Sequence, residues 1–322
     1  MQDATTWRRE HTMSNRCVKL HYRLPSRRAA WIGSSLLMLV SVLAHAAPAP
    51  ILVDIDWLAA HLNDPDIVLI DMSSDQLQYQ RFHIPGAVYL PYDALVTTRR
   101  DGVSVGISAE RLRTLLGQLG ADRNTHLVVY DDLGGLNAAR LFWELERLGH
   151  PRVSLVDGGL VKWILAGRAV TAEPHLPRPR RYEAGAVPAR NNLAELVDVV
   201  AARSQTGTML LDVRSEEEYR GNPKHRRSGH IPGAHWWEWQ NAVAFDQAFT
   251  QKPAPKVASL LDRLGLKDAN APVIVYCRTG HRAAHTYFTL RRLGFADVKI
   301  YDASMIEYSA RQDQPLRLGT AP

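Results

Sequence analysis

An internal repeat constrains the fold of this chain more than any other feature of its 322 residues. The motif HIPGA occurs at residues 83–87 and again at 230–234, an offset of 147. The run Val-Val-Tyr-Asp at 128–131 is matched by Ile-Val-Tyr-Cys at 274–277, an offset of 146. Two further pairs keep nearly the same spacing, namely 138–149 with 283–294 and 153–157 with 298–302. Such a regular offset predicts two consecutive copies of one structural unit.

Each copy alternates short apolar runs with longer amphipathic segments. This alternation is typical of parallel strands that are connected by helices. We therefore predict an α/β fold with two tandem domains, each a mainly parallel sheet that helices cover on both faces. The predicted domains are residues 51–168 and 191–316. Closely spaced prolines predict an extended linker over residues 169–190.

The N-terminal segment has the pattern of an export signal. Arg27 and Arg28 precede an apolar stretch, residues 29–43, which is followed by Ala-His-Ala at 44–46. A basic region, a short apolar stretch and a small-x-small site are typical of a cleavable signal peptide, and the stretch is short for a membrane span. We predict that residues 1–46 are this signal and that the mature protein is periplasmic or secreted. An uncleaved anchor is the alternative, and the sequence leaves both the Sec and the Tat route open.

The formal net charge of +6 lies almost entirely in this predicted signal peptide. Residues 1–46 contain seven Lys or Arg and two Asp or Glu, a net charge of +5, which leaves the mature chain near +1. A protein that binds nucleic acid through its phosphates needs a strong excess of basic residues. We therefore predict no nucleic-acid partner, and no membrane partner after signal cleavage.

Cys277 is one of two cysteines in the chain and is the only one outside the predicted signal peptide. It follows the apolar run 273–276 and precedes the amphipathic segment 283–293, so it is predicted to lie at a strand-to-helix turn. Such a turn directs backbone N–H groups and the positive end of a helix dipole at one point. A buried structural cysteine is the alternative. Two arginines and a histidine in the same loop favour a reactive thiolate instead.

The first copy provides an internal comparison for this cysteine. At the position that matches Cys277 it has Asp131, followed by Asp132, so it lacks the nucleophile. We predict that only the second copy is active by cysteine chemistry. Because HIPGA occurs in both copies, the motif indicates a structural role for its histidine.

With these features the chain resembles a tandem-domain rhodanese, a sulfurtransferase of the thiosulfate and 3-mercaptopyruvate type, over about residues 51–315. The resemblance implies an inactive first domain and a catalytic second domain. It also implies transfer of a sulfane sulfur through a persulfide on Cys277 to a thiophilic acceptor such as cyanide. The segments that carry it are the Cys277 loop, 130–132, 139–143 and 155–159 in the first copy, and 212–214, 218–221, 229–234 and 301–308 in the second.

Two departures from the family pattern concern the surroundings of the cysteine loop. The closing segment has Ala303, Met305 and Tyr308 where the family usually has a glycine and two tryptophans. Glu218 stands where the vertebrate-type enzymes have an arginine, so one anion contact is missing. A basic pair ahead of the second HIPGA is either solvated surface or a replacement for that substrate contact. Its members are Arg226 and Arg227.

The loop after Cys277 has groups that suit an anionic persulfide. Its backbone N–H groups would stabilise the terminal sulfur as an oxyanion hole does. Thr279 adds a hydroxyl donor, and Gly280 permits the backbone angles of a tight cradle. Arg282 is placed either to bind the anion or to tie the loop to the fold. The predicted persulfide and substrate loop consists of Arg278, Thr279, Gly280, His281 and Arg282.

The charge of Arg278 favours thiosulfate, a small dianion, as the sulfur donor. By resemblance, enzymes specific for 3-mercaptopyruvate have small uncharged residues there. A 3-mercaptopyruvate sulfurtransferase and a non-enzymatic, exported sulfane-sulfur carrier are the alternatives. A cysteine phosphatase needs Cys-x5-Arg, whereas this loop has Cys-x4-Arg. The expected partners are a small-molecule donor and a thiophilic acceptor, with a thiol protein as a further candidate.

The sequence predicts neither a metal nor another cofactor. His281 and His285 are four residues apart but have no third ligand nearby in the sequence. No glycine-rich nucleotide fingerprint follows a predicted strand.

Overall fold

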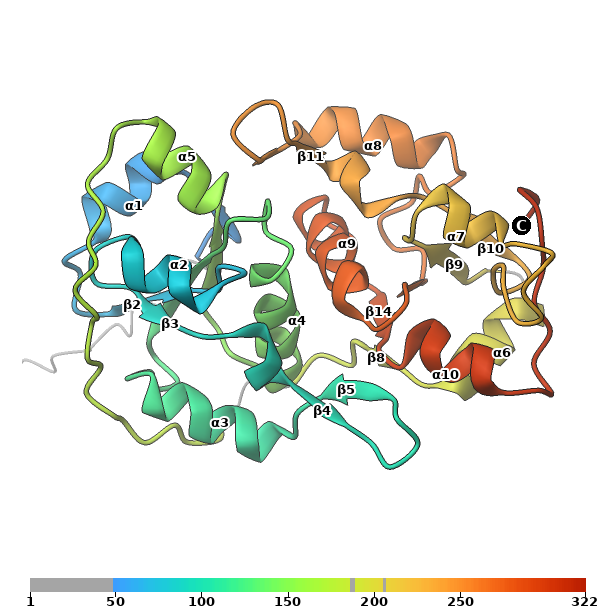
Figure 1. Cartoon of the computed structure of the whole chain (residues 1–322), viewed down its shortest axis with the longest axis horizontal. Helices are drawn as coiled ribbons and strands as arrows, with labels where there is room; N and C mark the ends of the chain where they lie inside the picture. The colour runs from blue at the N-terminus through green and yellow to red at the C-terminus, as the bar shows by residue number, and fades with distance from the viewer. Residues whose placement is uncertain (1–48, 186–188, 205–206) are drawn as a thin grey trace, which may run out of the picture. The chain divides into compact units, whose positions relative to one another are not determined.

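The computed structural model describes residues 49–185, 189–204 and 207–322 (Figure 1). The predicted signal peptide, residues 1–46, lies outside these ranges. Within them no helix combines the length and the apolar character needed to cross a membrane.

Each half of the described chain contains a five-stranded parallel sheet, and both sheets have the same strand order. The first sheet runs β1 (Leu52–Val53), β7 (Val153–Val156), β6 (His126–Tyr130), β2 (Ile67–Asp71) and β3 (Val88–Tyr89). The second runs β8 (Leu193–Ala194), β14 (Val298–Tyr301), β13 (Val273–Tyr276), β9 (Met209–Asp212) and β10 (Ala234–Trp236). Corresponding strands of the repeat hold corresponding places, which confirms the predicted duplicated α/β fold.

Helices connect these strands in the same order in both halves. In the first half they are α1 (Ile55–His61), α2 (Gln76–Arg81), α3 (Ala109–Gln118), α4 (Ala138–Leu148) and α5 (Gly159–Leu165), with the 3-10 helix η1 (Tyr92–Leu95). In the second half they are α6 (Leu196–Ser204), α7 (Glu216–Arg220), α8 (Ala254–Asp262), α9 (His281–Arg292) and α10 (Ser304–Ala310), with η2 (Trp239–Ala242).

Both faces of each sheet are covered by helices, because neighbouring strand residues point to opposite sides. In the first sheet Ile70 packs with side chains of α3 and α4, whereas Leu69 packs with those of α1 and α5. In the second sheet Val275 packs with α8 and α9, and Ile274 with α6 and α10. Burial on two faces explains why these strands are apolar throughout.

The two halves share one hydrophobic core cluster, which is centred on α4 and α9 (Figure 1). Phe142 of α4 meets Phe288 of α9 edge to face, with ring centroids 5.2 Å apart. Glu146 of α4 also pairs with Arg291 of α9, at 3.1 Å between Oε2 and Nε. The contact between the halves is therefore both apolar and ionic.

Each half also extends an antiparallel hairpin against the other half. The hairpins are β4 (Val96–Thr98) with β5 (Ser104–Gly106), and β11 (Val243–Ala244) with β12 (Thr250–Gln251). The Gly106 N–H donates to Asp302 Oδ2 at 2.7 Å, and the Gln251 N–H donates to Asp157 Oδ1 at 2.7 Å. Because Asp157 and Asp302 are equivalent positions of the repeat, the exchange of hairpins follows the duplication.

The described part of the predicted linker, residues 169–190, contains no helix or strand. It lies along the first half and contacts it at several separate points. Thr171 bridges to His83, and the Arg180 N–H donates to the Gly117 carbonyl at 2.8 Å. Tyr182 also hydrogen-bonds to His150, at 2.7 Å.

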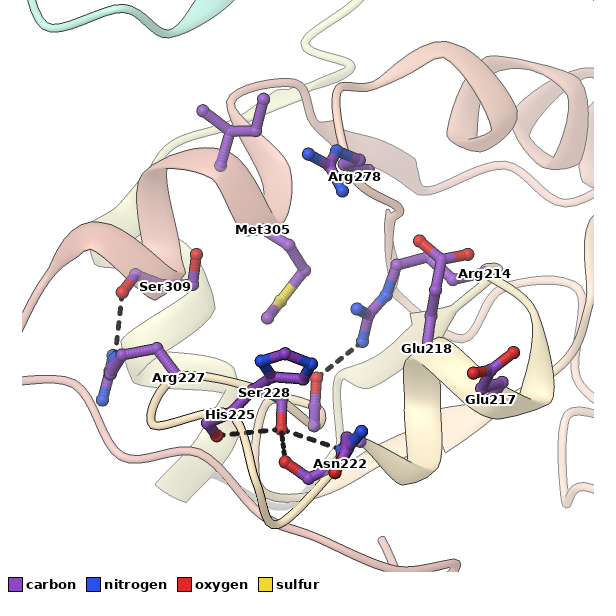
Figure 2. Close-up of a pocket in the computed structure, with 13 residues that line it drawn as sticks. Arg214, Glu217, Glu218, Asn222, His225, Arg227, Ser228, Arg278, Met305 and Ser309 are labelled. Carbon is purple, nitrogen blue, oxygen red and sulfur yellow. Dashed lines mark hydrogen bonds between the residues drawn. The ribbon is translucent and has the colours of Figure 1, made fainter.

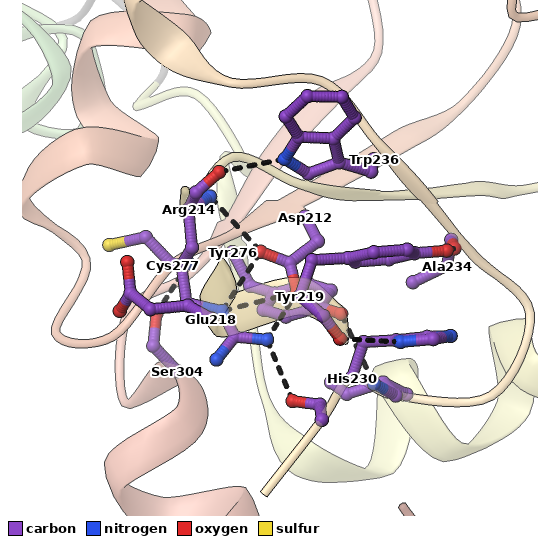
Figure 3. Close-up of polar contacts among 12 residues, drawn as sticks. Asp212, Arg214, Glu218, Tyr219, His230, Ala234, Trp236, Tyr276, Cys277 and Ser304 are labelled. Atoms are coloured by element: carbon purple, nitrogen blue, oxygen red, sulfur yellow. Dashed lines mark hydrogen bonds and ion pairs between the residues drawn. The ribbon is translucent and has the colours of Figure 1, made fainter. Parts of the chain in front are cut away.

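The HIPGA histidines have a structural role in both halves, and Figure 3 shows the one in the second half, His230. His230 stacks on Tyr219 at 3.8 Å between ring centroids and donates from Nδ1 to the Tyr219 carbonyl at 2.8 Å. His83 stacks on Tyr79 at 3.9 Å and donates to its carbonyl at 2.6 Å. Both histidines are fully buried. The motif therefore recurs because it closes the same turn twice.

Candidate active site

Cys277 lies directly after β13, at the start of the loop that leads into α9. It is a free cysteine with only 1% of its surface exposed. Gly280 ends the loop with φ +80°, a left-handed conformation that suits glycine, and serves as the N-cap of α9. The placement at a strand-to-helix turn is as predicted, and it puts the thiol near the positive end of the α9 dipole.

Ser304 supports the backbone of this loop from behind (Figure 3). Its Oγ accepts the N–H of Cys277 at 3.2 Å and the N–H of Gly280 at 3.1 Å, and donates to the Tyr301 carbonyl at 2.7 Å. Ser304 has φ +49°, a conformation that costs energy for a residue with a Cβ. This strain at a loop contact marks Ser304 as part of the site.

Two backbone N–H groups at the start of α10 donate hydrogen bonds to carbonyl groups of the loop. The Met305 N–H donates to the Cys277 carbonyl at 3.2 Å, and the Ile306 N–H donates to the Arg278 carbonyl at 3.1 Å. Both carbonyls are thus turned toward α10.

Arg282 joins the loop to α7. Its guanidinium donates to both oxygens of Glu218, at 2.5 and 3.0 Å. Glu218 also completes a capping box with Ser215 at the start of α7. Burial alone would raise the pKa of Glu218, but the hydrogen bonds and charge of Arg282 lower it to about 2. Of the two roles that the sequence left open for Arg282, this contact supports the one that ties the loop to the fold.

A cavity of about 500 Å³ opens beside the loop (Figure 2). Arg278 lies at its wall, is exposed, and its guanidinium has no partner among the described residues. Arg214 is buried and is held through Nε and Nη2 by Asp212 and by the Gly229 carbonyl. The other lining residues are Glu217, Glu218, Gly221, Asn222, His225, Arg227, Ser228, Gly229, Met305, Ile306 and Ser309.

Arg226 and Arg227 occupy different environments. Arg227 lines the cavity, but its guanidinium donates to backbone carbonyls near the end of α10, including Ser309 at 2.9 Å and Arg311 at 2.7 Å. Arg226 is exposed and is not among the residues that line the cavity. A substrate contact by either residue stays a prediction.

His281 faces the first half of the molecule. Its Nε2 donates to Asn137 Oδ1 at 2.8 Å, and its ring lies 4.1 Å from that of Tyr92. Burial, with the charges of Arg140 and Arg282, lowers the pKa of His281 to about 3. The ring is therefore neutral near pH 7, and His281 supplies the loop with a hydrogen bond rather than with the positive charge that the sequence suggested.

The first half has a loop of the same kind after β6. Asp131 occupies the position of Cys277, and its buried carboxylate accepts four backbone N–H groups. The donors are Leu133 at 2.9 Å, Gly135 at 2.8 Å, Asn137 at 2.8 Å and Ala138 at 3.0 Å. A loop of this geometry thus surrounds a negative group on its first residue with N–H donors.

The sequence analysis missed the residues that the first half brings to the loop. Tyr92, Asn137 and Arg140 come from the first half, and the sequence places none of them near Cys277. The one available signal was the aspartate that follows the matching apolar run in both copies, Asp157 and Asp302. The described residues contain no group of three or more His, Cys, Asp or Glu side chains placed to hold a metal.

Comparison with known proteins places both halves in one family. The model of the Rhodanese-like domain matches residues 54–166 and 196–311. The chain is 35% identical over 288 residues to the sulfur carrier protein TtuD of Thermus thermophilus. The aligned region covers 84% of this chain and 97% of TtuD. It is 34% identical over 286 residues to the Mycobacterium tuberculosis protein named "Putative thiosulfate sulfurtransferase", covering 85% and 100%.

Solved structures share the arrangement of both halves. The 3-mercaptopyruvate sulfotransferase SseA of Escherichia coli superposes with a TM-score of 0.70 at 26% identity, over 80% of this chain and 99% of SseA. The anaerobic ergothioneine biosynthesis enzyme of Chlorobium limicola gives a TM-score of 0.74 at 21% identity, over 84% of this chain and 70% of that one. The second likeness is one of fold.

Proposed function

Since this chain belongs to the rhodanese family, as its repeated motifs predicted, we propose that it moves a sulfane sulfur from thiosulfate to a thiophilic acceptor through a persulfide on Cys277. The observation that carries the proposal is the position of Cys277 in a loop whose counterpart, after β6, surrounds a carboxylate with four N–H donors. A persulfide is also an anion, and it needs hydrogen-bond donors around its negative charge as a carboxylate does. Backbone N–H groups of the second loop, other than those of Cys277 and Gly280, which donate to Ser304, would stabilise it as an oxyanion hole stabilises a developing negative charge.

The reaction takes two displacements. The Cys277 thiolate attacks the outer sulfur of thiosulfate, so that a new S–S bond forms while the bond to the sulfonate sulfur breaks. Sulfite leaves with that electron pair. In the second step the acceptor attacks the terminal sulfur, the Cys277–sulfur bond breaks, and the thiolate is restored. With cyanide as the acceptor the product is thiocyanate.

The choice of thiosulfate rests on Arg278. Its guanidinium is at the wall of the cavity and has no protein partner among the described residues, so it is free to bind a dianion. Arg214 adds a second guanidinium, which Asp212 holds in a fixed orientation. Charge-assisted hydrogen bonds to such groups are stronger than neutral ones.

Two other sulfur-transfer functions have support. The cavity of about 500 Å³, with Met305 and Ile306 on one side, has room for a larger donor such as 3-mercaptopyruvate. The relative TtuD is named as a sulfur carrier protein, which supports transfer to a protein acceptor. Both use the same Cys277 persulfide and differ in the molecule that supplies or receives the sulfur.

One set of measurements distinguishes these functions. The purified protein is mixed with thiosulfate or with 3-mercaptopyruvate, and the persulfide is detected by mass spectrometry as one added sulfur atom that Cys277→Ser lacks. Steady-state turnover with cyanide then tests release to a small acceptor. We expect thiosulfate to give the higher kcat/KM. A higher value for 3-mercaptopyruvate would reverse the donor assignment, and a persulfide that no small acceptor removes would favour the carrier.

We also propose that the protein acts outside the cytoplasm, because residues 1–46 have the signal pattern described above. N-terminal sequencing of the exported protein should find a start near Ala47 or Pro48. An intact N-terminus on an exported protein would favour the anchor instead.

A further inference from the structure

A buried carboxylate lies directly against the cysteine loop. Asp302 follows β14, and a Cβ added to Gly280 would come within 2.1 Å of its Oδ1. No side chain other than hydrogen fits at Gly280, and the loop backbone rests on this carboxylate. Asp302 is only 3% exposed. An isolated negative charge there would disfavour a second negative charge on the sulfur of Cys277.

Arg140 of α4 neutralises this carboxylate from the first half of the molecule. Its Nη1 donates to Asp302 Oδ1 at 2.5 Å and its Nη2 to Oδ2 at 3.1 Å. The guanidinium is fully buried and also meets Glu144 at 3.2 Å. Burial opposes the charge of Arg140, but Asp302 and Glu144 raise its pKa above the ordinary value. The arginine is therefore charged near pH 7.

The loop of the first half has no such support. The residue equivalent to Arg140 is His285, and burial lowers the pKa of His285 to about 4, which leaves it neutral. The residue equivalent to Asp302 is Asp157, whose charged partner is Lys162 at 3.5 Å, with both side chains partly exposed. The buried arginine is thus found behind the loop with the cysteine and not behind its counterpart.

We propose that Arg140 is a positioning residue for sulfur transfer: by neutralising Asp302, it allows the loop of the other half to hold a negative sulfur. This proposal rests on the proposed function for its link to turnover, but its effect on the thiol can be measured without any sulfur donor. It also gives the half without a nucleophile a defined part in the reaction.

Several other charged or titratable groups also face the loop, and all of them are present in each variant that is compared. Arg282 and Tyr92 lie near Cys277, and Glu218 pairs with Arg282. The remaining charged or titratable neighbours are Arg278, His281, Arg214 and Glu144.

The test compares the pH at which Cys277 ionises in three proteins: the parent, Arg140→Met, and Arg140→Met/Asp302→Asn. Ionisation is followed by the ultraviolet absorbance of the thiolate, with the same protein carrying Cys277→Ser subtracted. We expect Arg140→Met to raise the midpoint by roughly one pH unit or more, because Asp302 loses its counter-charge. The double variant should return the midpoint toward that of the parent. A midpoint that does not move in Arg140→Met would overturn the proposal.

Turnover gives a second readout. We expect Arg140→Met to lower kcat/KM for thiosulfate roughly tenfold, in line with the change of one unit in ionisation, and Asp302→Asn to recover most of that loss. If the thiol responds as expected but thiosulfate forms no persulfide, the proposed function fails while the role of Arg140 stands.

Arg291→Met is the matched control, because Arg291 also pairs across the halves, with Glu146, but does not contact the loop. It should lower the melting temperature and leave the ionisation of Cys277 unchanged. An equal shift in both variants would mean that any loss of contact between the halves disturbs the loop. If Arg140→Met does not fold, the ionisation of Cys277 in the single variant Asp302→Asn tests the proposal instead. Loss of the carboxylate must then move the midpoint to lower pH, and an unchanged midpoint would contradict the proposal.

Discussion

The loops after β6 and β13 occupy the same place in two copies of one fold but differ in where the negative charge comes from. In the first loop, the carboxylate of Asp131 is part of the chain and accepts four N–H groups at 2.8 to 3.0 Å. Burial raises the pKa of Asp131, and these N–H groups act against that rise. In the second loop a thiol stands at that position. The first loop thus holds a carboxylate among N–H donors, and under the proposed function the second loop would hold the persulfide sulfur on Cys277 in the same place.

The openings beside the two loops differ as well. The stacked Tyr and His are four residues apart in the first half and eleven apart in the second. The longer connection contributes Asn222, His225 and Ser228 to the cavity of about 500 Å³. The corresponding cavity of the first half, between α2 and α5, is about 300 Å³ and is lined mostly by apolar residues such as Leu160 and Ile164. The loop and this polar insertion therefore distinguish the second half from the first.

The largest effect is expected from removing the thiol, which distinguishes the second loop from the first. Cys277→Ser should abolish sulfur transfer, because a serine hydroxyl at this position is not ionised near pH 7 and forms no persulfide. The residue is nearly the same size, so the fold should persist. Activity is measured with thiosulfate and cyanide, and folding by circular dichroism and melting temperature. More than a trace of turnover would contradict the assignment of the nucleophile.

Acid should destabilise both halves together. Burial lowers the pKa of His126, His150 and His285 to about 4, and that of His281 to about 3. Below about pH 6.5 the unfolded chain binds protons that the folded chain does not. The stabilisation is therefore complete above that pH and is lost as the pH falls toward 4, by roughly 1.4 kcal/mol per pH unit for each histidine.

Melting temperatures from about pH 7 to pH 5 check this expectation. His150→Gln should lose about a quarter of the slope, since it removes one of four equivalent sites. A pH dependence equal to that of the parent would show that His150 takes up its proton without unfolding.

Arg278→Gly tests the role of the guanidinium that the second loop places at the wall of the cavity. Loss of the unpaired guanidinium should lower kcat/KM for thiosulfate by roughly tenfold to a hundredfold, because one or more charge-assisted hydrogen bonds to the dianion disappear. 3-Mercaptopyruvate has one carboxylate further from its sulfur and should be affected less. Parallel steady-state assays with both donors decide, and equal losses would mean that Arg278 shapes the loop rather than selecting the donor.

The smallest effect is expected from Asp131→Asn in the first loop. The amide has one acceptor oxygen instead of two, so N–H groups of the loop lose partners and the free energy of unfolding should fall by about 1 kcal/mol. Chemical denaturation measures this change. Turnover by Cys277 should stay within about twofold of the parent, because Asp131 belongs to the first loop and not to the cysteine loop. A large loss of activity would show that the two loops are coupled, through the hydrogen bond between Asn137 of the first loop and His281 of the second.

The repeat, the α/β alternation and the position of Cys277 were predictable from the sequence alone, because each is written in neighbouring residues and in the spacing of apolar runs. The structural role of HIPGA followed in the same way from its presence in both copies. The linker over 169–190 could be anticipated from its prolines, which restrict the backbone locally.

Tertiary structure alone decided how the halves act on each other. Arg140 and Asp302 are 162 residues apart, and no local pattern pairs them. The neutral state of His281 depends on burial against the first half, and the pairing of Arg282 with Glu218 depends on α7 lying beside the loop. Charge state and counter-charge are properties of a packed environment, so a sequence that places Cys277 at a strand-to-helix turn still leaves its electrostatic surroundings to the fold.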